Sequence, residues 1–369
     1  MSAEKPGKPT INDVAEKAGV SRATASRAIS NYGRINPETQ EHVRKVAAEL
    51  GYRPNELARA MRRGKTKTIG LVIIADFTNA FFDRATKGVV DAAKELGYQV
   101  LIANTDEDIS AERNAVATLI EKQVDGLIVV PSNSVVHDHL SPDALEGKPV
   151  VLIDRRLDGV RLTSVTTDDF TGAVAAVRHA ASLGHRRMGF LVAAPGVVGT
   201  TTDRPAVLIS SVEDRVNGFA SAYVDTPKSG KTATWIYCQD LPSVTERAVM
   251  SMLDQPKPPT VIFTSNNDMA LAVLKVTGNR QLALGRDISL VTFDDSQWLE
   301  AMSPGITVVS RPVEELSQIA VSKLIAEIDE PGQPKEKISL PTELIARGSV
   351  ANLILRPESD SISTKGVSF

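Results

Sequence analysis

The 369-residue sequence is poor in cysteine and in aromatic residues, and it has no long apolar run. Cys238 is the only cysteine, so no disulfide can form within the chain, and its place after the strand-like run Trp235-Ile236-Tyr237 predicts a packing role. No apolar run approaches the roughly 18 residues of a membrane-spanning helix, and no signal peptide precedes the first predicted helix. We therefore expect a cytoplasmic protein without membrane contact.

Motifs of the common enzyme classes are also missing from the sequence. No Gly-x-Gly-x-x-Gly follows the first predicted strand, and Gly64-Lys65-Thr66 resembles a phosphate loop only at its end, because Arg59 stands where that loop needs glycine. The five histidines form no catalytic motif, and His137 and His139 lack a third metal ligand at a suitable spacing. The sequence therefore predicts no enzyme, no cofactor and no bound metal.

Residues 10–30 have the pattern of two short helices joined by a tight turn. Thr10 caps a first helix, in which Val14 and Ala18 share one face. Gly19 permits the turn, and Ser21 caps the second helix. This pattern predicts a helix-turn-helix, in which the second helix lies in the major groove of DNA. The alternative is an ordinary helical hairpin with a solvated basic face.

The second of these helices has an apolar face, which contains Ala25 and Ile29, and an opposite polar face. The polar face includes Arg22 and Arg27, and an arginine can fork onto a guanine. We expect base readout chiefly from Arg22, Ala23 and Arg27. The full set expected to contact DNA from this helix is Ser21, Arg22, Ala23, Thr24, Ser26 and Arg27.

Positive charge is concentrated near the N-terminus. Residues 1–67 hold 14 Lys and Arg against 7 Asp and Glu, whereas residues 68–369 hold 28 against 38. The basic part includes a third predicted helix, which begins at Asn36-Pro37-Glu38 and stops at Gly51. A basic head on an acidic body suits a protein that docks one end on DNA phosphates. The charge distribution therefore supports double-stranded DNA as a partner.

From Thr68 onward, strand-like apolar runs alternate with helical stretches. The predicted strands are residues 69–75, 126–130, 149–153, 188–193, 234–238, 260–264 and 289–293. The predicted helices are residues 82–96, 111–122, 171–183, 214–223, 244–253, 268–277 and 313–329. Continuous apolar strands between helices indicate parallel sheets covered on both faces. Because the strands are too many for one small sheet, we expect two α/β subdomains.

Polar side chains follow several of these strands at their carboxyl ends, where open parallel sheets bind ligands. Asp154-Arg155, Asn267-Asp268 and Asp294 stand at such places. Carboxylates, amides and an arginine hold sugar hydroxyls by directional hydrogen bonds, and the aromatic pair Phe81-Phe82 can cover the C–H surface of a ring. Taken singly, some of these residues are helix caps instead, as Asn267 or Asp268 would be. Taken together, they predict a ligand pocket.

With these features the sequence resembles the lactose-repressor (LacI/GalR) family of bacterial transcription regulators. The matching residues are Asp13-Val14-Ala15, Ala18-Gly19-Val20-Ser21, Thr24, Ser26-Arg27, Tyr52, Pro54-Asn55 and Ala58-Arg59. The resemblance covers nearly the whole chain, except the first few and the last dozen residues. It implies an all-α helix-turn-helix head and an α/β core with two parallel-sheet lobes, as in periplasmic sugar-binding proteins.

The resemblance also implies roles for individual residues. Residues 55–62 are expected to be disordered alone and to fold into a hinge helix at the minor groove, where Asn55, Ala58 and Met61 contact DNA and Met61 unstacks a base step. The implied effector-binding set is Asn79, Phe81, Phe82, Asp154, Arg155, Arg215, Asn267 and Asp294. Departures from the family pattern are Ser310, where glutamine is frequent, Leu241, near a position that is often aromatic, and a long loop of residues 195–211, which we expect at the mouth of the cleft.

The domain boundaries expected from these patterns are as follows. Residues 1–53 form the helix-turn-helix domain, 54–67 the hinge helix and linker, 68–168 and 300–338 the N-terminal effector subdomain, 169–299 and 339–357 the C-terminal effector subdomain, and 358–369 a disordered tail. The chain is expected to cross between the subdomains near Asp168, at residues 298–304 and near Ser339.

Three classes of protein fit parts of this sequence. A plain solute-binding protein explains the body but not the basic head, and it would need an export signal. A sugar- or nucleotide-processing enzyme lacks its motifs. A ligand-controlled transcription regulator explains both parts. We therefore expect a homodimeric repressor of a carbohydrate or nucleoside utilisation operon, controlled allosterically by a pentose-like sugar or a ribonucleoside bound between the two subdomains.

Overall fold

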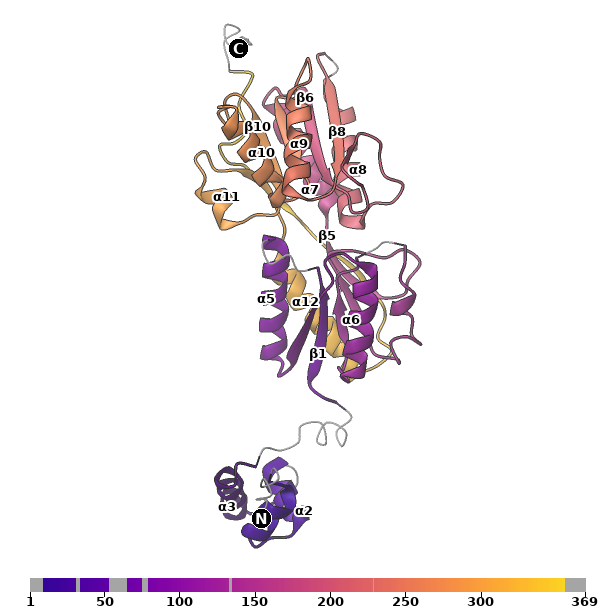
Figure 1. Cartoon of the computed structure of the whole chain (residues 1–369), viewed down its shortest axis with the longest axis vertical. Coiled ribbons are helices and arrows are strands. Elements are labelled where there is room, and N and C mark those ends of the chain that lie inside the picture. Colours follow the sequence, from indigo (N-terminus) through magenta and orange to yellow (C-terminus); the bar gives the residue numbers. More distant parts are fainter. Residues whose placement is uncertain are drawn as a thin grey trace, which may run out of the picture. The chain divides into compact units, whose positions relative to one another are not determined.

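The computed structural model describes residues 9–30, 34–52, 65–74, 79–132, 135–227 and 229–355. Contacts divide the chain into an N-terminal unit, Met1–Thr66, and a large unit, Lys67–Phe369 (Figure 1). Most of the predicted hinge and the predicted tail fall outside the described residues. Within the described ranges, no helix combines the length and the apolar character that crossing a membrane requires.

The N-terminal unit packs three helices around a small apolar core. They are α1 (Ile11–Lys17), α2 (Arg22–Ser30) and α3 (Pro37–Glu49). Thr10 caps α1 and Asn36 caps α3, as the sequence predicts. Val14, Ala25 and Val43, one from each helix, are fully buried in the core. These small side chains allow the three short helices to pack closely.

The large unit consists of two lobes, each built on one sheet (Figure 1). The sheet of the first lobe has the strand order β12-β5-β4-β3-β1-β2, and its neighbouring strands run parallel. Its strands are β1 (Thr68–Ile73), β2 (Gln99–Asn104), β3 (Leu127–Val129), β4 (Val150–Ile153), β5 (Thr163–Thr167) and β12 (Lys337–Leu340). Helices α5 (Ala80–Glu95) and α12 (Val313–Asp329) cover one face, and α6 (Ile109–Glu121) covers the other.

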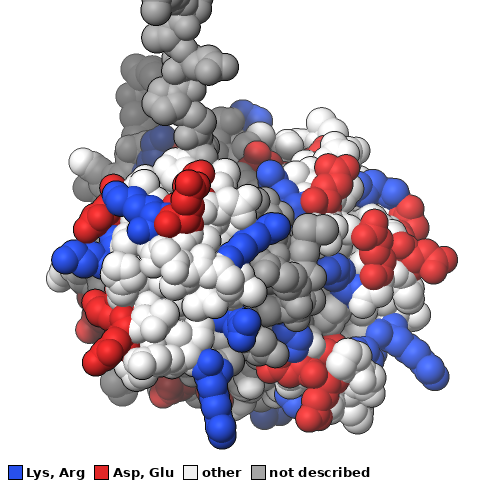
Figure 2. Space-filling model, turned by 90° about the horizontal axis from the view of Figure 1, so that it is seen from below, with Lys and Arg blue, Asp and Glu red and all other residues white. Residues whose placement is uncertain are grey.

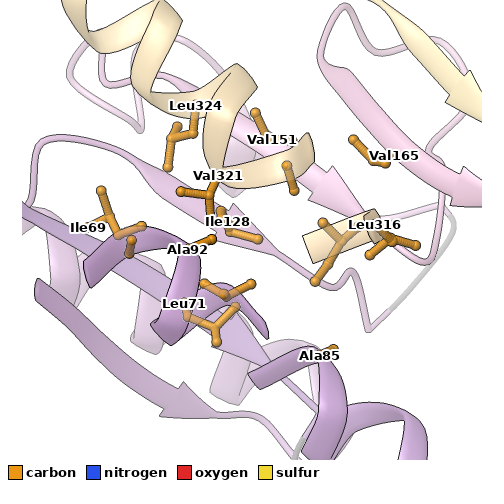
Figure 3. Packing of buried hydrophobic residues seen from close by; sticks show 14 of the residues in the cluster. Ile69, Leu71, Ala85, Ala92, Ile128, Val151, Val165, Leu316, Val321 and Leu324 are labelled. Atoms are coloured by element: carbon orange, nitrogen blue, oxygen red, sulfur yellow. The ribbon is translucent and has the colours of Figure 1, made fainter. Parts of the chain in front are cut away.

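Strand β1 shows how the sequence builds this sheet. Ile69 and Leu71 belong to the apolar cluster under α5 and α12, whereas Val72 belongs to the cluster under α6. Figure 3 shows Val321 of α12 packed near Ile128 of β3. Because both faces are covered, the strand is apolar almost throughout, which is the signal that predicts it from the sequence.

The sheet of the second lobe has the order β13-β11-β10-β9-β6-β8-β7, and it is parallel except where β13 and β7 join its edges. Its strands are β6 (Arg187–Ala193), β7 (Thr200–Thr201), β8 (Thr232–Cys238), β9 (Val261–Thr264), β10 (Ser289–Phe293), β11 (Thr307–Ser310) and β13 (Glu343–Ile345). Helices α7 (Asp169–Ser182) and α8 (Ser210–Val224) cover one face. Helices α9 (Pro242–Leu253) and α10 (Asn267–Asn279) cover the other, and the short α11 (Gln297–Ala301) follows β10.

The chain passes between the lobes at three places. The first lies after β5, at the predicted Asp168. The sequence predicts the second at residues 298–304, but β11 pairs with β10 in the second lobe, so this crossing falls at Arg311-Pro312. The third lies between β12 and β13, shortly after the predicted Ser339. The observed position of the second crossing places Arg311 at the boundary between the lobes.

Several strands of the described chain carry a weak sequence signal and were not predicted. They are β2, β5, β7, β11, β12 and β13. Strands β2, β7, β12 and β13 lie at sheet edges, and many of their side chains are exposed, so they lack the continuous apolar run of a central strand. Strand β5 is buried but consists mainly of Thr and Ser.

Candidate functional site

One face of helix α2 packs against the other two helices, and the opposite face is exposed. It follows a turn at Gly19, whose φ of +66° suits glycine. Ser21 Oγ then accepts a hydrogen bond from the amide of Thr24 at 3.1 Å and caps the helix. Ala25 and Ala28 are fully buried in the core of the three helices. The chain therefore presents one side of α2 outward.

The outward side of α2 carries the residues predicted to contact DNA. Ser21, Arg22, Ala23 and Arg27 are exposed, and Thr24 and Ser26 are half-buried. The Nε atom of Arg27 donates to the carbonyl oxygen of Ala23 at 3.3 Å. Exposed arginines on the outward side of such a helix can reach base edges in the major groove. The remaining predicted DNA contacts, Asn55, Ala58 and Met61, lie outside the described residues.

The charge on the face seen in Figure 2 is mixed. Lys and Arg side chains stand among Asp and Glu side chains there, without an unbroken basic patch. On α3, Arg44 and Lys45 are exposed. Separate basic side chains suit contacts with individual phosphates, which orient a protein on DNA without reading its sequence.

A cavity of about 870 Å³ lies between the two lobes of the large unit. Strand ends and helix starts from both lobes form its walls, as is usual for ligand sites in parallel sheets. The predicted effector-site residues that line it are Asn79, Phe81, Phe82, Asp154, Arg155, Arg215 and Asp294. The structure thus brings seven of the eight predicted residues to one cavity, and their role in binding stays a prediction.

Asn267, the eighth predicted residue, does not line the cavity. It is buried at the start of α10, and its Oδ1 atom has no hydrogen-bond partner among the described residues. Its neighbours Asn266 and Asp268 line the cavity instead. Asn266 is also the cap of α10, because its Oδ1 atom accepts from the amide of Met269 at 2.9 Å. The sequence predicts the cap of α10 one or two residues too late, because α10 starts earlier than its apolar pattern indicates.

Asp154 and Asp294 occupy equivalent places in the two lobes. They follow the central strands β4 and β10. The backbone amide of Asp154 donates to the carbonyl oxygen of Val165 at 3.0 Å, and that of Asp294 donates to the carbonyl oxygen of Val309 at 3.1 Å. Both have positive φ angles, +64° and +69°, in a region that aspartate tolerates better than most residues. Such strained positions often occur at binding sites. Here the two matching turns bring one carboxylate from each lobe to the same arginine, Arg311.

Arg311 joins these two carboxylates, and the sequence pattern did not identify it. Its Nη1 atom donates to Asp154 Oδ1 at 2.5 Å, and its Nε atom donates to Asp294 Oδ1 at 2.6 Å. Its guanidinium carbon lies 3.7 Å from the centroid of the Phe81 ring. Burial alone lowers the pKa of Arg311, but the carboxylates of Asp294, Asp154 and Asp169 outweigh burial and raise this pKa above its ordinary value. Arg311 is therefore a permanent positive charge with its partners in place.

Arg215 of α8 forms a second buried charge cluster. Its Nε atom donates to Asp169 Oδ2 at 2.7 Å, its Nη1 atom donates to the Ser265 carbonyl oxygen, and its guanidinium carbon lies 4.5 Å from the Phe293 ring centroid. Complete burial raises the pKa of Asp169, although Arg215 and Arg311 act in the opposite direction. Both buried arginines thus have protein carboxylates as partners.

Several polar contacts join the lobes beside the cavity, among them the following two. Asn79 caps α5 through its Oδ1 atom, and its Nδ2 atom donates to Asp268 Oδ2 at 2.9 Å in the second lobe. Arg156 of the first lobe forms a bidentate pair with Asp214 of α8, in which Nη2 donates to Oδ1 at 2.8 Å. Arg155, by contrast, is fixed within the first lobe, where its Nη1 atom donates to the Pro131 carbonyl oxygen at 2.9 Å. The relative position of the lobes therefore depends on a small number of named polar contacts.

Ser310 does not line the cavity, in contrast to the glutamine position with which the resemblance equates it. It pairs with Glu343 in the ladder between β11 and β13. The next residue, Arg311, lines the cavity. The sequence contains a signal that the strand ends at this point, because an arginine followed by Pro312 ends the apolar run of β11. Leu241, the other departure, does line the cavity.

The long loop of residues 195–211 reaches the cavity at its two ends. Pro195, Gly196, Ile209 and Ser211 line the cavity, whereas the middle of the loop runs along the sheet edge as β7, where it pairs with β8. Arg204 fastens the loop to α8, because its guanidinium donates to Asn217 and Glu213, each at 3.0 Å. The loop therefore forms one wall of the cleft mouth and does not cover it with its middle part.

Comparisons with known proteins identify the two parts of the chain. Residues 10–55 match the model of bacterial regulatory proteins of the lacI family, and residues 177–350 match the periplasmic binding protein-like domain. The HTH-type transcriptional regulator DegA of Bacillus subtilis (strain 168) is 32% identical over 354 residues, which cover 94% of this chain and 99% of that protein.

Solved structures share the fold of most of the chain. The Lac repressor dimer bound to operator and the anti-inducer ONPF has a TM-score of 0.80 and 23% identity, covering 94% of this chain and 100% of its own. The transcriptional regulator CelR in complex with cellobiose has a TM-score of 0.64 and 26% identity, covering 92% of this chain and 99% of its own. The predicted fold, a helix-turn-helix head with a two-lobed α/β core, is confirmed.

The match to DegA extends over nearly the full length of the chain, and the two domain matches join a lacI-type head to a periplasmic binding protein-like core. The relatives they identify are transcriptional regulators and not enzymes. The chain therefore belongs to the lacI family of bacterial regulatory proteins and is a DNA-binding transcriptional regulator.

Proposed function

We propose that this regulator represses a carbohydrate or nucleoside utilisation operon and that a neutral, polyhydroxylated small molecule controls it. The ligand, a pentose-like sugar or a ribonucleoside, would bind in the cavity between the lobes. The observation that carries this proposal is the placement of Asp154 and Asp294, from opposite lobes, on the same buried Arg311. A ligand that exchanges hydrogen bonds with this group contacts both lobes at once.

The charges of the cavity favour a neutral ligand over an anion. Seven of the residues that line the cavity are Asp or Glu, and four are Lys or Arg. The guanidinium groups of Arg311 and Arg215 already have carboxylate partners at hydrogen-bond distance. An anionic ligand would therefore meet an excess of negative charge. Carboxylates accept hydrogen bonds from hydroxyl groups, which suits a sugar.

A homodimer on a near-palindromic operator would give this ligand control over DNA. Two recognition helices would then read two half-sites, and the ligand would change the angle between the lobes and the approach of the two hinge segments. The edge strand β2 offers a surface for a second copy, because Leu96, Leu101 and Ile102 around it are 51%, 37% and 45% exposed. An open edge with apolar side chains is a favourable place for association.

A thermal-shift screen of the full chain against pentoses, hexoses, ribonucleosides, sugar phosphates and sugar acids tests the proposed ligand class. A neutral sugar or nucleoside at 100 times its Kd should raise the Tm on the order of 5 °C. Asp294→Asn should remove this rise, whereas an exposed control, Lys87→Ala, should retain it. A Tm rise with sugar phosphates or sugar acids only would contradict the proposal.

A further inference from the structure

The large unit begins at Lys67, where hydrogen bonds hold the backbone in place. The amide of Lys67 donates to Asp125 Oδ2 at 2.8 Å, and its carbonyl oxygen accepts from the amide of Gln99 at 2.9 Å. The amide of Asp125 in turn donates to the carbonyl oxygen of Thr68 at 2.7 Å. The chain that enters β1 is therefore tied to β2 and to the segment before β3.

The backbone of Lys67 is in the left-handed region, with a φ of +54°. This conformation is uncommon for a lysine, and residues keep it only where the surrounding structure fixes them. Glycine adopts it without strain, yet the chain has lysine at this turn. The choice of residue indicates that the lysine side chain has a role here.

The side chain of Lys67 lies over the ring of Tyr98. Its Nζ atom is 4.1 Å from the ring centroid, within the range of a cation–π interaction. The ring is itself fixed, because Tyr98 is only 3% exposed and belongs to the apolar cluster under α5 and α12. The amide of Tyr98 also donates to the carbonyl oxygen of Ala93, in the last turn of α5, at 2.8 Å. Lys67 thus rests on a firmly packed part of the first lobe.

We propose that Lys67 and Tyr98 form an anchor, which sets the direction in which the chain leaves the first lobe toward the DNA-binding head. Lys67 is then a positioning residue for operator binding. It acts without touching DNA, through the path of the residues that precede it. The inference concerns DNA binding by the ligand-free protein, so it does not depend on the ligand proposed above.

A fixed exit from the lobe lowers the cost of binding a specific site. Specific readout holds the head in one register on the bases, so the chain that joins the head to the lobe must adopt one path. Ordering a free exit on the operator would cost conformational entropy, and a preformed exit removes part of this cost. Binding to unrelated DNA relies on phosphate contacts and permits many registers, so it depends less on the exit.

A direct phosphate contact is the competing role for Lys67, because its side chain is exposed and positively charged. Such a contact strengthens binding to every DNA sequence and adds to the salt dependence of binding, and it does not involve the ring of Tyr98. The anchor requires the ring and leaves the salt dependence unchanged. The position of Nζ over a buried ring, with both backbone groups of Lys67 paired, favours the anchor.

Fluorescence anisotropy of the ligand-free full chain tests the anchor, on an operator selected from random DNA and on a scrambled duplex at several salt concentrations. Lys67→Asn removes the ammonium group, and asparagine tolerates the positive φ. This variant should bind the operator at least about threefold more weakly, as expected for loss of an exposed cation–π contact. Its affinity for the scrambled duplex and its salt dependence should not change. Lys67→Arg should retain operator affinity, because a guanidinium also stacks on an aromatic ring.

Substitutions of Tyr98 separate its ring from its hydroxyl group. The hydroxyl oxygen is buried without a hydrogen-bond partner among the described residues, so Tyr98→Phe should leave operator affinity unchanged. Tyr98→Leu removes the ring and should weaken operator binding as much as Lys67→Asn does. The two substitutions together should lose no more than the larger single loss, because both remove the same contact. Urea unfolding identifies the variants that are folded under the conditions of the assay.

Lys94→Asn is the matched control, because Lys94 is an exposed lysine in the last turn of α5, four residues before Tyr98. It removes the same charge and should leave both affinities unchanged. Weaker binding of both duplexes by Lys67→Asn, with a smaller salt dependence, would assign Lys67 to a phosphate and overturn the anchor. Unchanged operator affinity in Lys67→Asn would also overturn it, and so would an equal loss of operator affinity in Lys94→Asn.

Discussion

The Nε atom of Arg311 lies 2.6 Å from Asp294 Oδ1, and this bond ties a crossover between the lobes to the end of a central strand of the second lobe. The same guanidinium also bonds Asp154, which ends the matching strand of the first lobe. One side chain thus connects both sheets at the point where the chain changes lobe. We therefore expect Arg311 to contribute to the stability of the core and to the angle between its lobes.

Arg311→Ala should strongly destabilise the large unit. The substitution leaves Asp154 and Asp294 buried without their shared positive partner, and breaking a buried ion pair in this way costs about 3–5 kcal/mol. Urea unfolding of the variant should show this loss of free energy of unfolding. Lys87→Ala, which removes an exposed pair with Asp91, should leave the free energy of unfolding close to that of the wild type. If Arg311→Ala lowers the free energy of unfolding by less than about 1 kcal/mol, the buried charge cluster does not stabilise the large unit.

Asp294→Asn should abolish the ligand response and retain DNA binding. Like aspartate, asparagine tolerates the φ of +69° at this position, but its side chain lacks the negative charge of the carboxylate that accepts a hydrogen bond from Arg311. Losing a charged hydrogen-bond acceptor costs about 1.5–3 kcal/mol, so ligand affinity should fall at least tenfold. Calorimetry measures this affinity, and fluorescence anisotropy measures operator binding of the ligand-free protein. Unchanged ligand affinity would place the ligand elsewhere in the cavity.

The sequence predicted the central strands and the helices because their signal is local. Apolar runs such as that around Leu71 form buried parallel strands, and the caps Thr10 and Asn36 mark helix starts. The site at the strand ends followed from the same logic, as Asp154 and Asp294 illustrate.

Other features depend on contacts between segments that are distant in the sequence. Arg311 was not identified because its role follows from the pairing of β11 with β10, and the local signal, an arginine followed by Pro312 after an apolar run, does not by itself reveal that pairing. Strand β2 lies at the edge of its sheet, and its side chains are exposed or half-buried, so it lacks the continuous apolar run of a central strand. Asn267 differs from Asn266 by a single helical position, and sequence patterns locate helix ends less accurately than that.

Arg27→Ala should relax operator specificity. Arg27 is exposed on α2, and loss of an arginine that bonds a guanine costs roughly 1–3 kcal/mol at that base. Binding to a panel of operators with single substitutions measures the change. Arg44→Ala on α3 is the comparison, because loss of a phosphate contact should weaken all sequences alike and reduce the salt dependence of binding. Wild-type base preference in Arg27→Ala would remove Arg27 from base readout.

Arg156→Ala should change the coupling between ligand and DNA. The Arg156–Asp214 pair joins the lobes beside the cavity and is partly exposed, so its loss should cost about 1 kcal/mol or less in stability. The ratio of operator affinities with and without ligand should nevertheless shift severalfold. Arg204→Ala removes a similar pair with Glu213 that lies within one lobe, and it should leave the ratio unchanged. Equal ratios in the two variants would exclude Arg156 from the coupling.

Cys238 should be inert to thiol reagents in the folded chain. It is buried, and burial raises the pKa of its thiol to about 11, so roughly one thiol in a thousand is ionised at pH 8. Ellman's reagent should react with no thiol in the native protein at pH 8 and with one in urea. Because this pKa exceeds 9.0, the value of the unperturbed thiol, the free energy of unfolding should also fall as the pH rises from about 9 to 11. Fast reaction of the native protein would show that the strand β8 opens readily.

Operator affinity measured with and without the effector sugar tests the central claim most directly. The full chain would be titrated onto an operator selected from random DNA, with the tightest-binding sugar present or absent, and sugar affinity would be measured with and without that operator. Ligand control through the cleft predicts that the sugar changes operator affinity by at least about fivefold and that the operator changes sugar affinity by the same factor. A sugar that binds in the cavity but leaves operator affinity unchanged would contradict this account.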